Sequence, residues 1–278
     1  MYFGNRERMT WVKAPAINAD LSPNRWTNSG TYLNGGGYVR SSGTSHKVYQ
    51  FAWNLAKSED IRGVLDYYSG IYGDGLIYFL DPFAIRTNLL PVYWSAPRLG
   101  KDDAPTLVRD QRPTLVATAF NTNDYPTMSA VYTLSAASTP AELYIPVPPG
   151  YVFHLGVHGT ATGTARVEVI PTNINGTVRT AVDAPLMSVT TQQRTNTAVD
   201  NVSGVTIRVT GTGILNLAGM MAQVLEAGQE VLPGGFISGQ GHSGVRFDGV
   251  PVLTGYSAPE ALDLQGASAT LKEVGSWE

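Results

Sequence analysis

Glycine loops are the first places where residue types and spacing could support chemistry. Gly239-Gln-Gly241-His-Ser-Gly244 has the G-x-G-x-x-G spacing of dinucleotide-binding loops. That chemistry requires a strand before the loop and a helix after it, whose N-terminus meets the pyrophosphate. Residues 245–251 instead predict a strand and a turn. Gly35-Gly36-Gly37 lacks the Gly-Lys-Ser/Thr ending of a phosphate loop. Both segments are therefore predicted to be structural.

The histidines are the second candidates. His154 and His158 are four residues apart and would face one metal ion on a helix. On the strand predicted here they would be roughly 13 Å apart, at about 3.3 Å per residue, which is too far for one metal. His46 next to Ser45 suggests a base and a nucleophile. There is no G-x-S-x-G elbow and no ordered acid partner to support that pairing.

Two further patterns have simple structural explanations. Tyr49, Phe51 and Trp53 alternate along a predicted strand and could bind sugar, but a core-facing stripe is favoured. Asp102-Asp103 is predicted to be a solvated turn. The sequence thus predicts no enzyme, no catalytic residue, no cofactor and no metal site, and it identifies no ligand-binding residue. Glycosidase acids far apart in the chain stay open as an alternative.

Length and composition favour a two-domain protein with extensive contact surfaces. The chain has 278 residues, of which 43% are hydrophobic and only 15% charged, against about 25% charged in typical soluble domains. Residues 1–111 have a net charge of +2 and residues 112–278 of −5, which supports a boundary near 111. There is no cysteine, so disulfides and thiolate metal sites are excluded.

Neither targeting nor membrane insertion is predicted. Residues 1–9 have no apolar core of the length found in signal peptides. No apolar run approaches the roughly 18 residues that a membrane-spanning helix needs.

The first region predicts strands around one helix. Asn34-Gly35 indicates a hairpin, and residues 46–53 a strand. Ser58 is predicted to cap a helix that ends at Gly70. A doubly buried strand is expected at 76–80, an irregular arm at 88–97 and a linker at 100–113.

The second region predicts a β-sandwich, because short strands recur every 10–15 residues. The candidate strands of this region are 143–147, 151–157, 166–170 and 205–210, and a further strand is expected at 269–274 in the C-terminal segment. Residues 217–225 have helical spacing, but we expect a strand with an irregularity at Gly219. The sequence leaves open whether residues 235–278 complete the second domain or pack on the first.

Several strings occur together in a characteristic order. They are Tyr32–Gly37, Ser45–Trp53, Gly70–Pro82, Asn88–Pro91, Trp94–Pro97, Gly241–Phe247 and Glu273–Trp277. In this combination the chain resembles the minor tail proteins of long-tailed bacteriophages that infect actinobacteria. The resemblance covers residues 1–100 well, the end of the chain moderately and the middle only in general character.

The resemblance extends to distal tail proteins and implies their architecture. Residues 1–111 would be a β-rich tail-ring domain with one helix, and residues 112–278 a galectin-like or carbohydrate-module-like β-sandwich. In that group, usually six copies form a ring that joins the tail tube to the tip or baseplate. The implied partners are copies of the chain itself, the tail tube protein and other tail-tip or baseplate proteins. DNA would pass through the channel without specific binding. The implied location is the tail tip of the virion, after assembly in the host cytoplasm.

Two alternatives remain at this stage. One is a carbohydrate-binding module that recognises a host cell-surface glycan. The other is a tail-associated hydrolase acting on the host wall polysaccharide.

Overall fold

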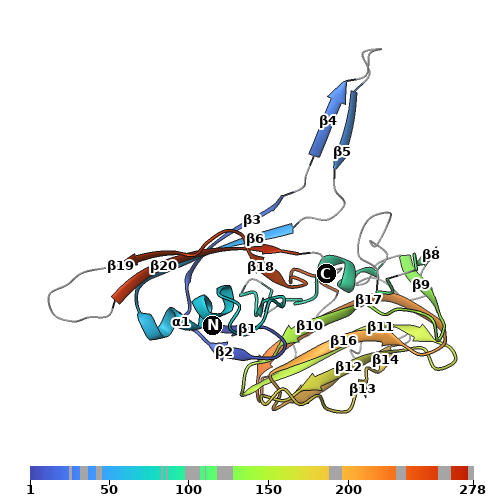
Figure 1. The fold of residues 1–278 in the computed structure, drawn as a ribbon. Helices are drawn as coiled ribbons and strands as arrows, with labels where there is room; N and C mark the ends of the chain where they lie inside the picture. Colours follow the sequence, from blue (N-terminus) through green and yellow to red (C-terminus); the bar gives the residue numbers. More distant parts are fainter. Residues whose placement is uncertain are drawn as a thin grey trace.

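The computed structural model shows a chain that is mainly β, as predicted. Two hydrophobic clusters organise it, one beneath a sheet built from both ends of the chain and one inside a sandwich (Figure 1). The structure describes residues 1–24, 27–31, 37–41, 46–82, 84–85, 87–97, 107–109, 111–117, 128–187, 196–229, 236–255 and 264–274.

The first sheet joins the two ends of the chain. Its central strands are β6 (His46–Lys57) and β20 (Leu264–Glu273), which pair antiparallel. Strand β3 (Ala16–Asn24) pairs with the other side of β6. Strands β18 (Val245–Phe247) and β19 (Val252–Gly255) both pair with β20. The C-terminal segment therefore completes the sheet of the N-terminal region.

An aromatic core covers one face of this sheet. Tyr49, Phe51 and Trp53 are buried there, so the predicted core stripe is confirmed. Helix α1 (Ser58–Tyr68) contributes Ile61 and Val64 to the same cluster. A small sheet of β1 (Tyr2–Gly4), β2 (Met9–Trp11) and β7 (Tyr78–Phe79) also packs against it.

Two details of the prediction in this region are wrong. Ser58 is the first residue of α1, while Lys57 holds the cap position and makes no side-chain cap bond. The predicted strand at 76–80 is reduced to β7, because Ile77 makes only an isolated bridge with Val245. Ile77 and Phe79 belong to one hydrophobic cluster, whereas Leu80 packs against the other.

A hairpin projects from the first sheet. Strands β4 (Thr27–Thr31) and β5 (Gly37–Ser41) pair antiparallel, with Thr31 opposite Gly37. The predicted hairpin is thus confirmed, although its Asn34-Gly35 turn lies outside the described residues. Figure 1 shows this hairpin reaching away from the body of the molecule.

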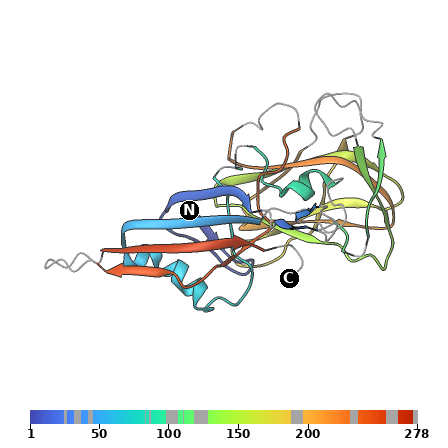
Figure 2. The same ribbon diagram turned by 90° about the horizontal axis from the view of Figure 1, so that it is seen from above.

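The second region is a sandwich of two sheets, which lie side by side in Figure 2 with the first sheet beyond their end. Its strands are β8 (Thr114–Ala117), β9 (Met128–Leu134), β10 (Glu142–Pro146), β11 (Tyr151–Ala161), β12 (Arg166–Thr172), β13 (Val182–Asp183), β14 (Leu186–Met187), β15 (Asn196–Asp200), β16 (Gly204–Thr210) and β17 (Gly213–Glu226). One sheet has the order β10-β16-β12-β13, and the other β14-β11-β17-β9-β8 with β15 also on β11. All the strands predicted in this region are confirmed, with boundaries shifted by a few residues.

Strand β17 resolves the ambiguous segment as a strand. His158 of β11 lies opposite Gly219, but the next residue, Gly159, lies opposite Leu217. Ala218 is the extra residue of this bulge, next to the predicted irregularity. The bulge explains the step from Leu217 to Met220, because one inserted residue breaks strict alternation. Met221 and Leu225 are buried outside the sandwich core, so apolar residues on both faces complete the helix-like spacing.

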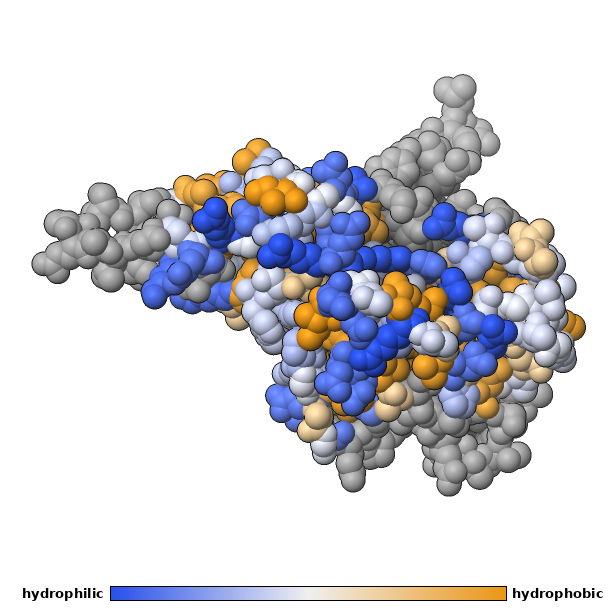
Figure 3. Space-filling model, turned by 60° about the horizontal axis from the view of Figure 1, so that its bottom comes forward, coloured by the Kyte–Doolittle hydropathy of each residue, from blue (hydrophilic) through white to orange (hydrophobic). Residues whose placement is uncertain are grey.

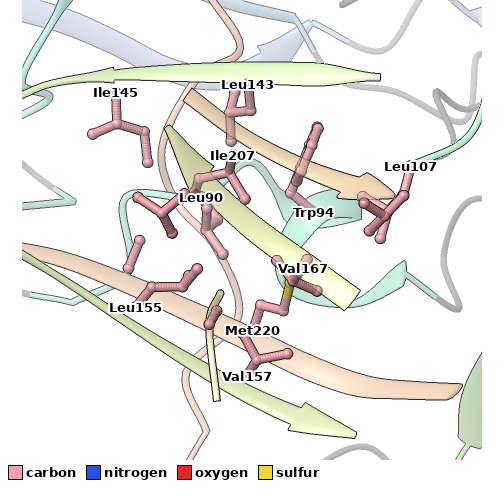
Figure 4. Packing of buried hydrophobic residues seen from close by; sticks show 14 of the residues in the cluster. Leu90, Trp94, Leu107, Leu143, Ile145, Leu155, Val157, Val167, Ile207 and Met220 are labelled. Carbon is pink, nitrogen blue, oxygen red and sulfur yellow. The ribbon is translucent and has the colours of Figure 1, made fainter. Parts of the chain in front are cut away.

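The core of the sandwich includes residues that precede it in the chain. Leu90, Trp94 and Leu107 are fully buried among strands of both sheets (Figure 4). Trp94 lies on α2 (Val92–Ser95), so the predicted irregular arm is in fact a packed segment with one helical turn. The boundary at residue 111 stays a prediction, and apolar packing crosses it.

Candidate functional site

A buried polar cluster lies between the two hydrophobic cores. Asp81 follows β7 and is only 1% exposed. Its Oδ2 accepts a hydrogen bond from the Tyr49 hydroxyl at 2.8 Å and one from Lys47 Nζ at 3.2 Å. Burial, together with the Asp81 charge, raises the pKa of Tyr49 far above its usual value. Tyr49 is therefore a permanent donor that holds this carboxylate.

Glu273, at the end of β20, forms the other half of the cluster. Its Oε1 accepts a hydrogen bond from the backbone N–H of Ser243 at 3.0 Å, and the Ser243 hydroxyl oxygen lies 3.3 Å from the same atom. Its Oε2 accepts from the backbone N–H of Lys47 at 3.1 Å. This carboxylate thus fixes the loop before β18 to the start of β6.

His242 is buried between these groups. Its Nδ1 accepts from the backbone N–H of Gly244 at 3.2 Å, so the ring proton lies on Nε2, 3.1 Å from the carbonyl oxygen of Phe79. Both ring nitrogens are therefore engaged with backbone. The Ser243 hydroxyl donates to the carbonyl of Val274 at 2.8 Å. We call the place where residues 79–81, the loop before β18 and strands β6 and β20 meet the junction. At these residues His242 and Ser243 do not form a Ser–His pair, because both bond to other groups.

His242 should make folding stability sensitive to acid. Burial lowers its pKa to about 4, although nearby Asp81 opposes the shift. Because the folded-state pKa is lowered, the unfolded chain takes up a proton first. The contribution of neutral His242 to the free energy of unfolding is thus fully present above about pH 6.5, and it is lost as the pH falls toward 4. Between pH 7.5 and 5 we expect a loss of about 2 kcal/mol in the free energy of unfolding.

Urea unfolding of wild type and of His242→Gln at both pH values measures this effect. The variant should lose about 2 kcal/mol less than wild type across the interval. Burial also lowers the pKa of His154 and His158. Their contribution is present in both proteins and cancels. An equal pH dependence in the two proteins would contradict the assignment to His242.

The glycine motif makes close packing possible. Gly239 and Gly241 lie directly against the backbone of residues 89–91, and a Cβ at either position would overlap a carbonyl oxygen there. The Gln240 N–H donates to the carbonyl of Asn88 at 2.9 Å, and the Gly241 N–H to that of Leu90 at 3.1 Å. Strand β18 follows the loop, as predicted, where a dinucleotide loop would open a helix.

Asn88 is the residue at this junction that sequence reasoning missed. Its side chain is fully buried and makes four hydrogen bonds. The amide nitrogen donates to the carbonyls of Met220 and Ile237, and the oxygen accepts from the N–H groups of Ala222 and Leu90. Asn88 therefore joins the segment before α2, strand β17 and the glycine loop.

The other sequence candidates do not converge. His154 and His158 lie on strand β11. Within the part of the chain that the structure describes, no three His, Asp or Glu side chains are placed to hold a metal ion. The side chain of His46, and all of Ser45, residues 35–36 and Asp102-Asp103, lie outside the described residues.

A ladder of ion pairs links the first region to the sandwich. Arg6 pairs with Glu142 at 2.8 Å, and Glu142 lies 3.7 Å from Arg208. Arg208 contacts Glu168 at 3.0 Å, and Arg166 bridges Glu168 to Asp183. Figure 3 shows one face of the molecule, on which hydrophilic and hydrophobic areas lie next to one another. The partners are up to 136 residues apart, so sequence patterns could not pair them.

Both regions have surface clefts in the part of the chain that the structure describes. One of about 360 Å³ lies beside the Arg6–Glu142 pair and is lined by Tyr72, Asp74 and Arg109. The other, of about 230 Å³, lies at one end of the sandwich, with Ser135, Ser138, Thr210 and Thr212 around it. Among the described residues of the sandwich, every aromatic side chain is buried or half-buried.

The described part of the chain also contains no helix long and apolar enough to cross a bilayer.

Comparison with known proteins gives little similarity. No family model and no curated protein matches the chain. A chain from the structure of infectious bursal disease virus, Gt strain, is 9% identical over 98% of this chain and 74% of its own, with a TM-score of 0.24. The VP2 subviral particle of the same virus is 10% identical over 98% and 79%, with a TM-score of 0.21. These TM-scores are too low to establish a shared fold, and no function follows from them.

Proposed function

We propose that this chain is a structural subunit of a bacteriophage tail tip, where copies close into a ring that connects the tail tube to the tip or baseplate. The resemblance of residues 1–100 to phage tail proteins supports this role. The observation that carries it is the projecting β4–β5 hairpin.

The hairpin lacks the support that a two-stranded sheet needs. In the described part of the chain, β4 and β5 pair only with each other. An isolated hairpin is marginally stable in water, and its free edges are templates for further strands. A neighbouring subunit would provide the missing contacts. A projecting hairpin therefore suits a chain that acts by assembly.

The junction between the two β-rich regions suits a connector that transmits force. The cluster around Asp81, the bonds of Asn88 and the ion pair of Arg6 all join segments far apart in the chain. The bonds of Asn88 and the ion pair of Arg6 reach strands of the sandwich, so they fix the sandwich relative to the first region. In a ring, each sandwich would then serve as a rigid bracket for neighbouring tail proteins.

Native mass spectrometry of the purified chain, with and without the hairpin, tests the proposal. Wild type should form closed rings, expected to contain six copies, or should co-assemble with tail tube protein. A variant with a short Gly-Ser linker in place of residues 27–41 should stay monomeric while its unfolding midpoint is unchanged. A wild type that is monomeric at all concentrations and never joins tail particles would refute the proposal.

A further inference from the structure

We propose that the β4–β5 hairpin of one subunit docks on the exposed edge of β19 in the next subunit. This inference rests on the ring proposed above and names the surface that closes it. The occupant of the β19 edge is thus a second copy of this chain.

Strand β19 presents an unusual free edge. Val252 is 61% exposed and Leu253 is 48% exposed, and Val250 just before them is 72% exposed. Successive side chains of a strand point to opposite faces, so both faces are apolar here. The strand pairs with β20 on one side, and in the described residues its other side has no partner. Natural edge strands usually have protecting charges, whereas β19 (Val-Leu-Thr-Gly) has none.

The hairpin and the β19 end have opposite charges. Residues 21–46 contain Arg25 and Arg40 and no acidic residue. Residues 247–265 contain Asp248, Glu260 and Asp263 and no lysine or arginine. Complementary charge steers partners together and selects one register over others. It favours a second copy over a partner of unrelated charge.

The positions of the two patches fit a ring. In both ribbon views the hairpin and the β19 end are well separated on the first sheet (Figures 1 and 2). Two different patches on one subunit make a head-to-tail contact, which closes into a ring when the rotation between subunits allows it. A hairpin edge laid along β19 would satisfy backbone N–H and C=O groups of both strands.

Cysteine cross-linking tests the contact directly, because the natural chain has no cysteine. Ser29→Cys on β4 is combined with Leu253→Cys on β19 and treated with a short bis-maleimide. A second pair combines Ser41→Cys on β5 with the same Leu253→Cys. At least one pair should give covalent oligomers up to the ring size, with the cross-linked peptides identified by mass spectrometry. Ser29→Cys with Thr212→Cys, at the far end of the sandwich, should stay unlinked.

Charge reversal provides a second measurement. Arg40→Glu or Asp248→Lys alone should weaken assembly about tenfold at low salt, and the double variant should recover it. Wild-type rings without β19 cross-links, or equal cross-linking at Thr212, would overturn this inference and leave the ring intact. A wild type that forms no ring would overturn both proposals.

Discussion

Gly241→Ala should destabilise the protein by about 3 kcal/mol or more, because the new methyl group has no space. A Cβ at this position would overlap the carbonyl oxygen of Leu89. The obstacle is backbone, so a rotamer change cannot relieve it. The loop would have to move away from residues 89–91 and lose its hydrogen bonds to Asn88 and Leu90.

Gly75→Ala is the matched control. A Cβ there meets nothing closer than the Asn5 Cβ at 3.8 Å, which is an ordinary contact. We expect its free energy of unfolding to change by less than about 1 kcal/mol. Urea unfolding of wild type and both variants gives the comparison. Similar stabilities for the two alanine variants would show that the loop is loosely packed.

The sequence predicted most of the local elements. Alternation identified the aromatic stripe of β6 and the strands of the sandwich, because side chains on one face of a strand repeat every second residue. Residues 217–225 show the limit of this method. Their spacing matched a helix, and only the surrounding strand pattern favoured β17, whose bulge at Ala218 disturbs the alternation.

The junction could not be predicted from local patterns. Asn88 looks like an ordinary turn residue, and its role depends on strand β17, more than 130 residues later. Strand β9 pairs with β17 only as far as Leu217, so an edge beyond that residue is left for the Asn88 segment. Trp94 likewise fills a core formed by later strands. Such contacts depend on which edges and cavities the finished fold leaves open.

Asn88→Asp should be the most damaging isosteric change at this junction. The new side chain keeps the acceptor for Ala222 and Leu90 but replaces the amide donor with an oxygen. That oxygen would face the carbonyls of Met220 and Ile237, now 3.0 and 2.9 Å from the amide nitrogen. The four groups that bond to this fully buried side chain are all backbone groups, so none of them is a cation that would balance a carboxylate. At pH 7.5 we expect a loss of about 4 kcal/mol.

Asn88→Ala separates charge from lost hydrogen bonding. It removes all four bonds and should cost about 3 kcal/mol at any pH. The introduced carboxyl differs, because burial among carbonyl oxygens raises its folded-state pKa above the ordinary value of about 3.9. The Asn88→Asp protein is thus most stable below about pH 3.9, and its free energy of unfolding falls as the pH rises. Asn88→Asp should be less stable than Asn88→Ala at pH 7.5 and at least as stable at pH 4.5. If urea unfolding gave the same difference between the two variants at both pH values, a buried charge would not be the cause.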